Sequence, residues 1–426
     1  MVRLGEDKGC IVVKFGGGSL SGGERFAKAI DAVVKKAKEG VGLVVVVSAM
    51  GRTTDELIEV ATKASGGRPS PRELDDLLSM GERTSARIFA TALKAKGMRT
   101  CYLDPTDEEW PIITDENFGN ARPLLSLCLE RIQRTMIPLL EDGIIPVVPG
   151  FLGRSQKGAI TTLGRGGSDT TAFIVARALK AKQIILVTNV KGIMTADPKI
   201  IKNPRKIERI DAETLAGLAD SDVKFIHKKA LKYKDPSVDI KVVDWEAGSL
   251  DAEGTIIRGS LPKDLRVEAD YEEPLMAITI VGRGLEDSPE VLRRVLDELK
   301  RAGVASLGMS SNSNSIILYL PEKVPEGLLE ALHNVVLEYP DKAIALAVKR
   351  GLSLLRIRGM GLEDTPGVIG RLTKPLQENN INISGMLTIT SSILVFLDWG
   401  ERERALGLIR DSLRPNDGEV LGEGEI

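Results

Sequence analysis

The sequence predicts an α/β protein with a mainly parallel sheet, helices on both faces of that sheet, and a repeated small unit at the C-terminal end. Up to about residue 260, short apolar runs with strand character alternate with helical patterns, which is typical of a parallel sheet. Runs such as Leu43–Val47 are apolar throughout, as strands buried on both faces are. Beyond about residue 260, one sequence pattern occurs twice.

The strands and helices of the first part alternate along the chain. We expect strands at Cys10–Phe15, Leu43–Ser48, Thr100–Leu103, Ile144–Pro149 and Gln183–Thr188. We expect helices between them at Phe26–Ala37, Pro71–Lys96, Pro123–Glu141 and Ser168–Lys182, the last with Ser168 as its cap. Ligands of such sheets usually bind outside the carboxyl ends of the strands, where polar and glycine-rich clusters occur in this chain.

The C-terminal part contains an internal repeat. Gly284–Pro289 (GLEDSP) matches Gly361–Pro366 (GLEDTP), and an amphipathic helix follows each copy. Strands are expected next, at Ala305–Met309 and Ser315–Leu320 in the first copy and at Asn382–Met386 and Ser392–Asp398 in the second. With a final helix, the order is the βαββα of a ferredoxin-like unit. Ser288 and Thr365 are expected as helix N-caps that precede a proline.

The composition fits a globular protein of more than one domain and argues against several functional classes. At about 150 residues per domain, 426 residues correspond to two or three domains. The 58 Lys and Arg residues nearly balance the 60 Asp and Glu residues, which argues against a general polyanion binder. Aromatic residues make up only 4% of the chain, too few for a platform that stacks nucleic-acid bases.

Cysteines, histidines and hydropathy bear on metal chemistry and location. Cys10, Cys101 and Cys128 lie far apart, and with only two histidines they cannot form the usual structural zinc site, so we expect no metal held by the protein itself. Unpaired cysteines favour a reducing compartment. No apolar run approaches the roughly 18 residues of a membrane span, and the N-terminus lacks the apolar core of a signal peptide. We expect a cytoplasmic protein.

The strongest local signal is a glycine turn directly after a strand, at Lys14–Ser19 (KFGGGS). Successive backbone N–H groups of Gly16, Gly17 and Gly18 can form a nest for an anion, and Lys14 adds a positive charge. The segment is neither a Walker A loop nor a GxGxxG motif. Taken alone, a purely structural turn explains it equally well.

A second glycine-rich segment, Gly164–Asp169 (GRGGSD), opens a predicted helix. Glycines at a helix N-terminus suit an anion. Arg165 could bind a carboxylate through two parallel hydrogen bonds, and Asp169 could orient lysines around a transferred phosphoryl group. An ordinary capped helix is the alternative.

Further candidates are weaker on local evidence. Within Thr188–Lys199 (TNVKGIMTADPK), Asp197 and Lys199 could hold ribose and phosphate, although such a segment is most often a solvent loop. Glu82 and Lys224 lie in helical patterns, where charged side chains normally face solvent. His227 is better explained as a packed or capping residue than as a catalyst.

Taken together and in order, these segments resemble the aspartate kinases, which have the amino-acid kinase fold. The matching segments are Lys14–Ser19, Val46–Thr54, Gly81–Ser85, Ile112–Ala121, Gly164–Ala172, Thr188–Lys199 and Asp222–Ala230, and the repeat resembles tandem ACT domains. The resemblance implies a three-layer αβα catalytic domain at residues 1–265. It also implies two βαββαβ ACT domains at residues 266–348 and 349–426.

The resemblance implies transfer of the ATP γ-phosphoryl group to the side-chain carboxylate of L-aspartate, giving 4-phospho-L-aspartate for lysine, threonine and methionine synthesis. That carboxylate is ionised at pH 7, because its pKa is near 3.9, so no general base is required. Phosphoryl transfer needs positioning and charge neutralisation, which suits a site of lysines, glycines and one arginine. Mg²⁺ would bridge the phosphates and be held largely by them and by water.

The resemblance also implies roles for individual residues. Lys14 and the glycine nest would neutralise the phosphoryl group, Lys224 would reach the nucleotide phosphates, and Asp169 would organise these cations. Arg165 would take a substrate carboxylate and Glu82 the substrate ammonium. The aspartate pocket would be lined by Ser48, Thr54, Glu82, Phe151, Arg165 and Ser168. The nucleotide would lie along Gly16, Gly17, Gly18, Thr188, Asn189, Met194, Asp197 and Lys199.

The sequence departs from the family pattern mainly on the nucleotide side. Gly18 stands where the family has threonine, Asn189 where it has aspartate, Met194 where it has tyrosine and Lys199 where it has arginine. Asp222 and Val223 replace a Gly-Ala pair. The sequence therefore leaves the nucleotide preference open.

In tandem ACT domains, the effector commonly lies between the first strand–helix turn and the second strand. The corresponding residues here are Asp287, Ser288, Val304, Met309, Ser310 and Ser315. The resemblance implies feedback inhibition by lysine or threonine, with a purely structural dimerisation module as the alternative. A homodimer or larger homo-oligomer through the repeat is expected, because exposed sheet edges need partners.

Two other functions compete with this interpretation. A glutamate or acetylglutamate kinase would share the fold, but the repeat and the Gly81–Glu82 helix weigh against it. An amino-acid sensor with a degenerate kinase domain would explain the substitutions on the nucleotide side. Against the sensor, Lys14, Arg165, Asp169 and Lys224 are all present.

Overall fold

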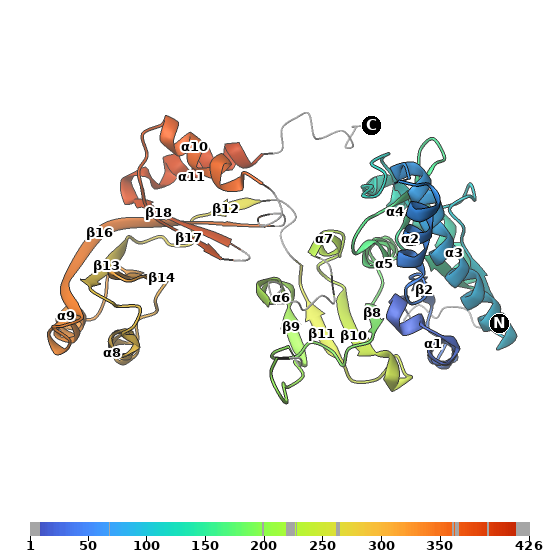
Figure 1. The fold of residues 1–426 in the computed structure, drawn as a ribbon, viewed down its shortest axis with the longest axis horizontal. Helices are drawn as coiled ribbons and strands as arrows, with labels where there is room; N and C mark the ends of the chain where they lie inside the picture. Colours follow the sequence, from blue (N-terminus) through green and yellow to red (C-terminus); the bar gives the residue numbers. More distant parts are fainter. Residues whose placement is uncertain are drawn as a thin grey trace. The chain divides into compact units, whose positions relative to one another are not determined.

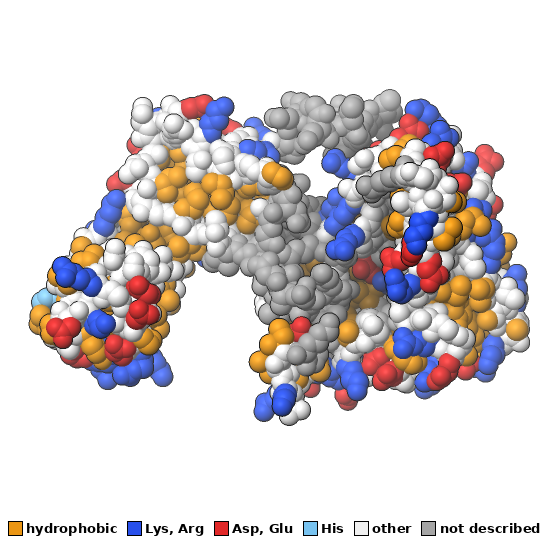
Figure 2. Space-filling view, viewed as in Figure 1, with side chains coloured by type: hydrophobic (Ala, Val, Ile, Leu, Met, Phe, Trp, Pro, Cys, Tyr) orange, Lys and Arg blue, Asp and Glu red, His pale blue; other side chains and the backbone are white. Residues whose placement is uncertain are grey.

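The computed structural model describes residues 9–67, 69–197, 200–218, 226, 228–260, 265–359, 362, 366–389 and 392–414. The chain divides into two compact units, Met1–Leu261 and Pro262–Ile426 (Figure 1). Positive and negative side chains are interspersed on the surface of each unit (Figure 2), as the nearly balanced charge predicts. No helix in the described part of the chain is both long and apolar enough to cross a membrane.

The N-terminal unit is built on a sheet whose described strands run in the order β3-β5-β2-β1-β8-β10-β11-β9. Their bounds are β1 Ile11–Phe15, β2 Leu43–Val47, β3 Thr100–Tyr102, β5 Ile145–Pro149, β8 Gln183–Thr188, β9 Arg209–Asp211, β10 Asp239–Asp244 and β11 Thr255–Arg258. All strands from β3 to β10 in this order are parallel, and β11 pairs antiparallel with β10. The predicted fold class is confirmed, and all of the expected strands form.

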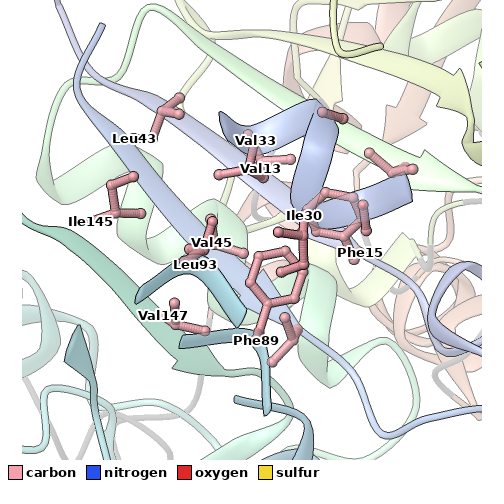
Figure 3. Packing of buried hydrophobic residues seen from close by; sticks show 14 of the residues in the cluster. Val13, Phe15, Ile30, Val33, Leu43, Val45, Phe89, Leu93, Ile145 and Val147 are labelled. Carbon is pink, nitrogen blue, oxygen red and sulfur yellow. The ribbon is translucent and has the colours of Figure 1, made fainter. Parts of the chain in front are cut away.

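Helices cover both faces of this sheet. On one face, α1 (Gly23–Ala37) and α3 (Pro71–Ala95) pack on Val13, Phe15 and Val45 in one core, with Phe89 of α3 against Phe15 (Figure 3). On the other face, α5 (Gly167–Ala178) packs against β1, β2 and β8, and α4 (Leu125–Glu141) packs beside α5. Side chains alternate along a strand, so Lys14, between Val13 and Phe15, points to the α5 face.

Smaller elements complete the N-terminal unit. A short sheet joins β4 (Ile113–Thr114), β6 (Leu152–Ser155) and β7 (Ile160–Thr162). The remaining helices are α2 (Thr53–Ala64), α6 (Ala212–Leu218), α7 (Lys228–Leu231) and the 3₁₀ turns η1 (Gly17–Leu20) and η2 (Trp245–Ala247). The helices α2 and α6 and the strands β4, β6, β7, β9, β10 and β11 were not predicted from the sequence.

The start of α5 differs from the prediction. Gly166, with φ of +74°, occupies the N-cap position, and no side chain caps the helix, so Ser168 is inside it. A left-handed residue at this position favours glycine, which explains Gly166. The helix ends at Ala178 rather than Lys182, and Lys180 is itself left-handed with φ of +47°.

The C-terminal unit contains the predicted repeat. Its helices are α8 (Pro289–Ala302), α9 (Leu328–Glu338), α10 (Val368–Glu378) and α11 (Arg402–Leu413), preceded by the 3₁₀ turn η3 (Trp399–Glu401). Its strands are β12 (Arg266–Glu268), β13 (Leu275–Gly282), β14 (Gly308–Ser311), β15 (Ser315–Pro321), β16 (Ala343–Arg358), β17 (Ile383–Ile389) and β18 (Ser392–Asp398). The expected βαββα order occurs in both copies, although β14 starts later than predicted.

The two copies share one long strand. The first half of β16 pairs with β13 and the second half with β18, and Gly351, with φ of +71°, lies between the halves. The expected boundary between residues 348 and 349 therefore falls inside β16. In addition, β12 precedes the first copy in sequence but pairs with the second half of β16, and its Val267 packs in the core of the second copy.

Candidate active site

The carboxyl ends of β8, β1, β2 and β5 lie side by side, and most of the predicted site residues follow them. Because these strands are parallel neighbours, their ends reach the same edge of the sheet. Main-chain hydrogen bonds continue the ladder past the strand ends, from Gly16 N to Val187 O (3.1 Å), from Ser48 N to Phe15 O (3.1 Å) and from Gly150 N to Val47 O (2.8 Å).

An ion pair between Lys14 and Asp169 lies at this edge. Lys14 Nζ is 2.7 Å from Asp169 Oδ1, and the two side chains are only 15% and 7% exposed. The strand β1 carries Lys14, and the first turn of α5 carries Asp169, so their proximity depends on how α5 packs on the sheet. An ammonium group has three N–H donors, so this pair leaves Lys14 able to bind a further anion.

The glycine turn forms as predicted, but only two of its three glycine N–H groups remain available to an anion. The N–H of Gly16 donates to Val187 O, and the N–H of Ser19 donates to Gly16 O. Within the described part of the chain, Gly17 N and Gly18 N donate to no main-chain oxygen. The N–H groups that can meet an anion are therefore those of Gly17 and Gly18, beside Lys14.

Gly17 is required by close packing of the turn. A Cβ atom on Gly17 would lie 2.7 Å from the carbonyl oxygen of Ala49, which follows β2. We therefore expect Gly17→Ala to displace the turn or the residues after β2 and to lower kcat/KM about tenfold or more, since small misplacements of reacting groups are costly. Steady-state kinetics would measure this loss.

Gly23→Ala is the matched control for Gly17→Ala. Gly23 begins α1, and a Cβ atom there would have nothing within 4 Å. Alanine favours a helix over glycine, so Gly23→Ala is expected to keep full activity and to raise Tm slightly. Equal kcat/KM values for Gly17→Ala and Gly23→Ala would contradict the role given to the turn.

Arg25 at the start of α1 also holds the turn, a contact that was not predicted from the sequence. Arg25 Nη1 donates to Gly18 O at 2.7 Å, and the Arg25 guanidinium lies 4.3 Å from the centre of the Trp245 ring. Gly18 is also next to Asn189, because a Cβ atom on Gly18 would lie 3.6 Å from Asn189 Cγ. Two departures from the family pattern are thus neighbours in space.

Glu82 is buried, so the general expectation of a solvated helical glutamate is wrong here. Glu82 is only 4% exposed, because Gly81 lets α3 approach the chain after β2. A Cβ atom on Gly81 would lie 2.8 Å from Ala49 Cβ. Oε1 accepts a hydrogen bond from Ala49 N at 3.0 Å, while Oε2 is buried with no hydrogen-bond partner among the described residues. Burial raises the pKa of Glu82 to about 7, against the opposing effect of the Ala49 N–H.

The start of α5 packs tightly on the chain that follows β5. A Cβ atom on Gly150 would lie 2.8 Å from Ser168 Cβ, and one on Gly167 would lie 2.7 Å from Phe151 Cδ2. Phe151 has a φ of +69°, and its N–H donates to Thr171 Oγ1 at 3.2 Å. The structure thus brings Phe151 and Ser168 together, with exposed Arg165 just before them on the turn into α5.

The remaining predicted residues are less closely associated. Thr54 is half-buried in the first turn of α2, beyond Ser48. Thr188 ends β8, and its Oγ1 accepts from Val190 N. Further along, Met194 forms an isolated antiparallel β-bridge with Lys206. The main-chain oxygen of Asp197 accepts hydrogen bonds from Ile200 N and Ile201 N. Lys199 and Lys224 lie outside the described residues.

Two polar groups near this site were not predicted, one of them buried (Asp75) and the other half-buried (Lys229). Asp75 lies on α3, and Lys229 lies on α7. Burial and the nearby Arg122 lower the pKa of Lys229. Asp75 precedes Glu82 by seven residues, a spacing that puts both carboxylates on one helix face, so helical periodicity could have identified it.

In the C-terminal unit, the structure brings together part of the predicted effector set. The turn after β13 meets the start of β15 through hydrogen bonds from Gly282 N to Asn314 O and from Leu285 N to Ser313 O, near Asp287 and Ser315. Ser288 lies at the N-cap position of α8, but its hydroxyl donates to Gly284 O and does not cap the helix. Ser310 and exposed Met309 lie on β14, whereas Val304 lies beyond the far end of α8.

Comparison with known proteins agrees with this architecture. The model of the Amino acid kinase family matches residues 9–244. The aspartokinase of Geobacillus stearothermophilus is 34% identical over 388 residues, which cover 88% of this chain and 90% of the relative. The aspartokinase of Bacillus sp. (strain MGA3) is 31% identical over 423 residues, covering 97% of this chain and 100% of the relative.

Solved structures agree as well. The structure of aspartate kinase from Synechocystis is similar with a TM-score of 0.74 and 26% identity, over 95% of this chain and 70% of that chain. E. coli aspartokinase III in complex with aspartate and ADP shares the fold, with a TM-score of 0.55 and 22% identity, over 95% of this chain and 100% of that chain. The chain therefore belongs to the amino acid kinase family and, within it, to the aspartokinases.

Proposed function

We propose that this protein transfers the γ-phosphoryl group of ATP to the side-chain carboxylate of L-aspartate, giving ADP and 4-phospho-L-aspartate. The observation that carries the proposal is the largely buried Lys14–Asp169 pair just before the glycine turn, where the N–H groups of Gly17 and Gly18 donate to no main-chain oxygen among the described residues. Such a site offers positive charge and hydrogen-bond donors to an anion. The names of the full-length relatives support aspartate as the acceptor.

The reaction needs no proton transfer at the acceptor. The aspartate carboxylate is ionised at neutral pH, and one of its oxygens forms the new bond to the γ-phosphorus while the bond from that phosphorus to the bridging oxygen of ADP breaks. Lys14 and the N–H groups of Gly17 and Gly18 would stabilise the charge on the transferring group. Asp169 would keep Lys14 pointed at it, and Lys224 would bind the nucleotide phosphates.

The aspartate pocket would lie between α3 and the start of α5. Arg165 would bind a substrate carboxylate, and Glu82, with a buried oxygen that has no hydrogen-bond partner in the described residues, would bind the ammonium group. Ser48, Thr54, Phe151 and Ser168 would complete the lining. The nucleotide would lie along the glycine turn and the Thr188, Asn189, Met194, Asp197 and Lys199 segment.

Magnesium fits this site as an ion carried by the nucleotide. Among the described residues, no three Asp, Glu, His or Cys side chains gather into a metal site, and Asp169 already pairs with Lys14. A phosphate-bound Mg²⁺ needs few protein ligands and would neutralise charge on the phosphates.

The C-terminal unit would be regulatory. We propose ACT domains at residues 266–348 and 349–426 that share β16, after a catalytic domain at residues 1–265. Feedback inhibition by lysine or threonine would connect the enzyme to lysine, threonine and methionine synthesis. In the described part of the sheet, β14 and β17 are edge strands, and β14 exposes Met309, which supports a homodimer through this unit. The free cysteines fit a cytoplasmic location.

Trapping the product tests the proposed reaction. An acyl phosphate reacts with hydroxylamine to give a hydroxamate, so the protein with Mg-ATP, L-aspartate and hydroxylamine is expected to form aspartyl hydroxamate and ADP in equal amounts. Added lysine or threonine is expected to lower the rate or to shift Tm. ADP formation without hydroxamate would contradict the proposed product, and insensitivity of both rate and Tm would contradict the proposed effectors.

A further inference from the structure

A buried carboxylate that the reaction does not use lies at Asp75 on α3. The residue is 1% exposed, and its oxygens accept hydrogen bonds from Gly119 N (2.9 Å), Thr162 N (2.8 Å) and Thr162 Oγ1 (2.6 Å). Burial raises the pKa of Asp75, and these hydrogen bonds oppose that effect. Asp75 thus connects α3 to two segments distant in sequence, the chain after β4 and the end of β7.

Lys229 also contacts these two segments. Its ammonium donates to Leu163 O at 2.8 Å and to Asn120 Oδ1. The two segments also bond to each other, from Ala121 N to Thr162 O at 2.8 Å. A carboxylate therefore accepts from the N–H groups of residues 119 and 162, while an ammonium donates to oxygens of residues 120 and 163.

The next residues of the chain belong to the substrate side of the site. Gly164 is left-handed, with φ of +69°, and a Cβ atom there would lie 2.7 Å from Asn120 Oδ1. The turn therefore packs directly on the chain after β4 that Asp75 and Lys229 contact. Arg165 follows immediately. The position of the Arg165 backbone is thus set by contacts that Asp75 anchors.

The helix α3 also fixes the opposite side of the proposed pocket. Glu82 lies seven residues after Asp75, about 10 Å along the same buried helix face, and binds Ala49 N. One rigid helix therefore holds both the Glu82 carboxylate and, through Thr162, the turn that carries Arg165. These two residues would bind opposite charges of one substrate, so their separation must be constant.

We propose that Asp75 is a positioning residue for aspartate binding: it sets the distance between Glu82 and the Arg165 turn. This inference rests on the proposed function. Loss of the hydrogen bonds from Gly119 and Thr162 to Asp75 would weaken aspartate binding. It would leave the glycine turn, Lys14 and the nucleotide segment unchanged, because Asp75 contacts none of them in the described part of the chain.

Asp75→Asn and Asp76→Asn form a matched pair for the test. The neighbouring Asp76 is exposed on the same helix, so its replacement makes the same chemical change without the clamp. We expect Asp75→Asn to raise KM for aspartate about tenfold or more, with KM for ATP and kcat within about twofold of the unmodified protein. Asp76→Asn is expected to leave all three values unchanged. Thr162→Val removes one donor and should raise KM for aspartate less, which keeps the test valid if Asp75→Asn folds poorly.

The outcomes separate the two claims. An unmodified protein that does not phosphorylate aspartate would overturn the proposed function, and the role of Asp75 with it. Aspartate turnover by the unmodified protein, combined with an unchanged KM for aspartate in Asp75→Asn and Thr162→Val, would overturn the positioning role alone. A parallel rise of both KM values, or a loss confined to kcat, would show a general structural role and overturn the proposal as well.

Discussion

Replacing Lys14 with methionine is expected to lower kcat by about 10³-fold or more, because in the proposed reaction this residue supplies positive charge where negative charge is transferred. Its ammonium lies near the carboxyl end of β1, 3.8 Å from where a Cβ atom on Gly16 would be, just before the turn of Gly17 and Gly18. Hydroxamate formation by the variant and by the unmodified protein would measure the loss. Lys35→Met, an exposed lysine on α1, is the control and should retain activity.

The Lys14 variant needs a second control for stability. Removing one member of a buried ion pair leaves an uncompensated charge and costs about 3–5 kcal/mol. Lys14→Met is therefore expected to lower Tm, whereas Lys14→Met combined with Asp169→Asn should recover much of it, since the pair is then replaced by neutral groups. Activity should not recover. A folded double variant with normal kcat would contradict the role given to Lys14.

Replacing Glu82 with glutamine is expected to raise KM for aspartate about 100-fold, because the variant lacks the buried carboxylate that we propose binds the substrate ammonium. The effect should fall mainly on KM, since Glu82 contacts Ala49 N rather than the glycine turn. Isothermal titration with aspartate would measure the weaker binding directly. Glu56→Gln, on the exposed side of α2, is the control.

The same substitution should change stability in a pH-dependent way. The folded pKa of Glu82 is about 7, above the ordinary value of 4.5, so its stabilising contribution is complete below pH 4.5 and is lost as the pH rises through 7. Glu82→Gln is therefore expected to raise the unfolding free energy at pH 8 by up to about 3 kcal/mol, and Tm with it. Near pH 4.5 the substitution should change Tm little. Thermal unfolding at both pH values measures this.

Ionisation of Glu82 should lower stability but strengthen aspartate binding. In the proposed site only the ionised form of Glu82 would attract the substrate ammonium, so KM for aspartate in the unmodified protein is expected to fall as the pH rises toward 7. The Glu82→Gln variant should lack this dependence. A variant whose KM follows the same pH profile as the unmodified protein would contradict the assignment.

Much of the fold and part of the site could be predicted, because the relevant signals are local. Buried parallel strands are continuous apolar runs, and the residues that follow them are polar or glycine, so the position of the site at the strand ends was predictable from the sequence. Lys14 stood out because it interrupts the apolar run Ile11–Phe15. The repeat was visible as matching residues, although the sharing of β16 was not, since pairing partners are not encoded locally.

The burial of Glu82 and the clamp by Asp75 could not be predicted from local rules. Both depend on how α3 packs against chain segments after β2, β4 and β7. A charged residue in a helix is normally solvated, and only tertiary contacts reverse this. The same applies to the start of α5, where Ser168 was the predicted cap but the left-handed Gly166 occupies the N-cap position.

The most direct test of the central claim is ADP release from Mg-ATP with L-aspartate, L-glutamate or N-acetyl-L-glutamate as the acceptor. We expect turnover with L-aspartate alone, because the proposed site binds both the ammonium and the carboxylates of a short amino acid. Turnover with glutamate or acetylglutamate instead would contradict the assigned acceptor. Silence with all three would contradict the assigned reaction and favour an amino-acid sensor.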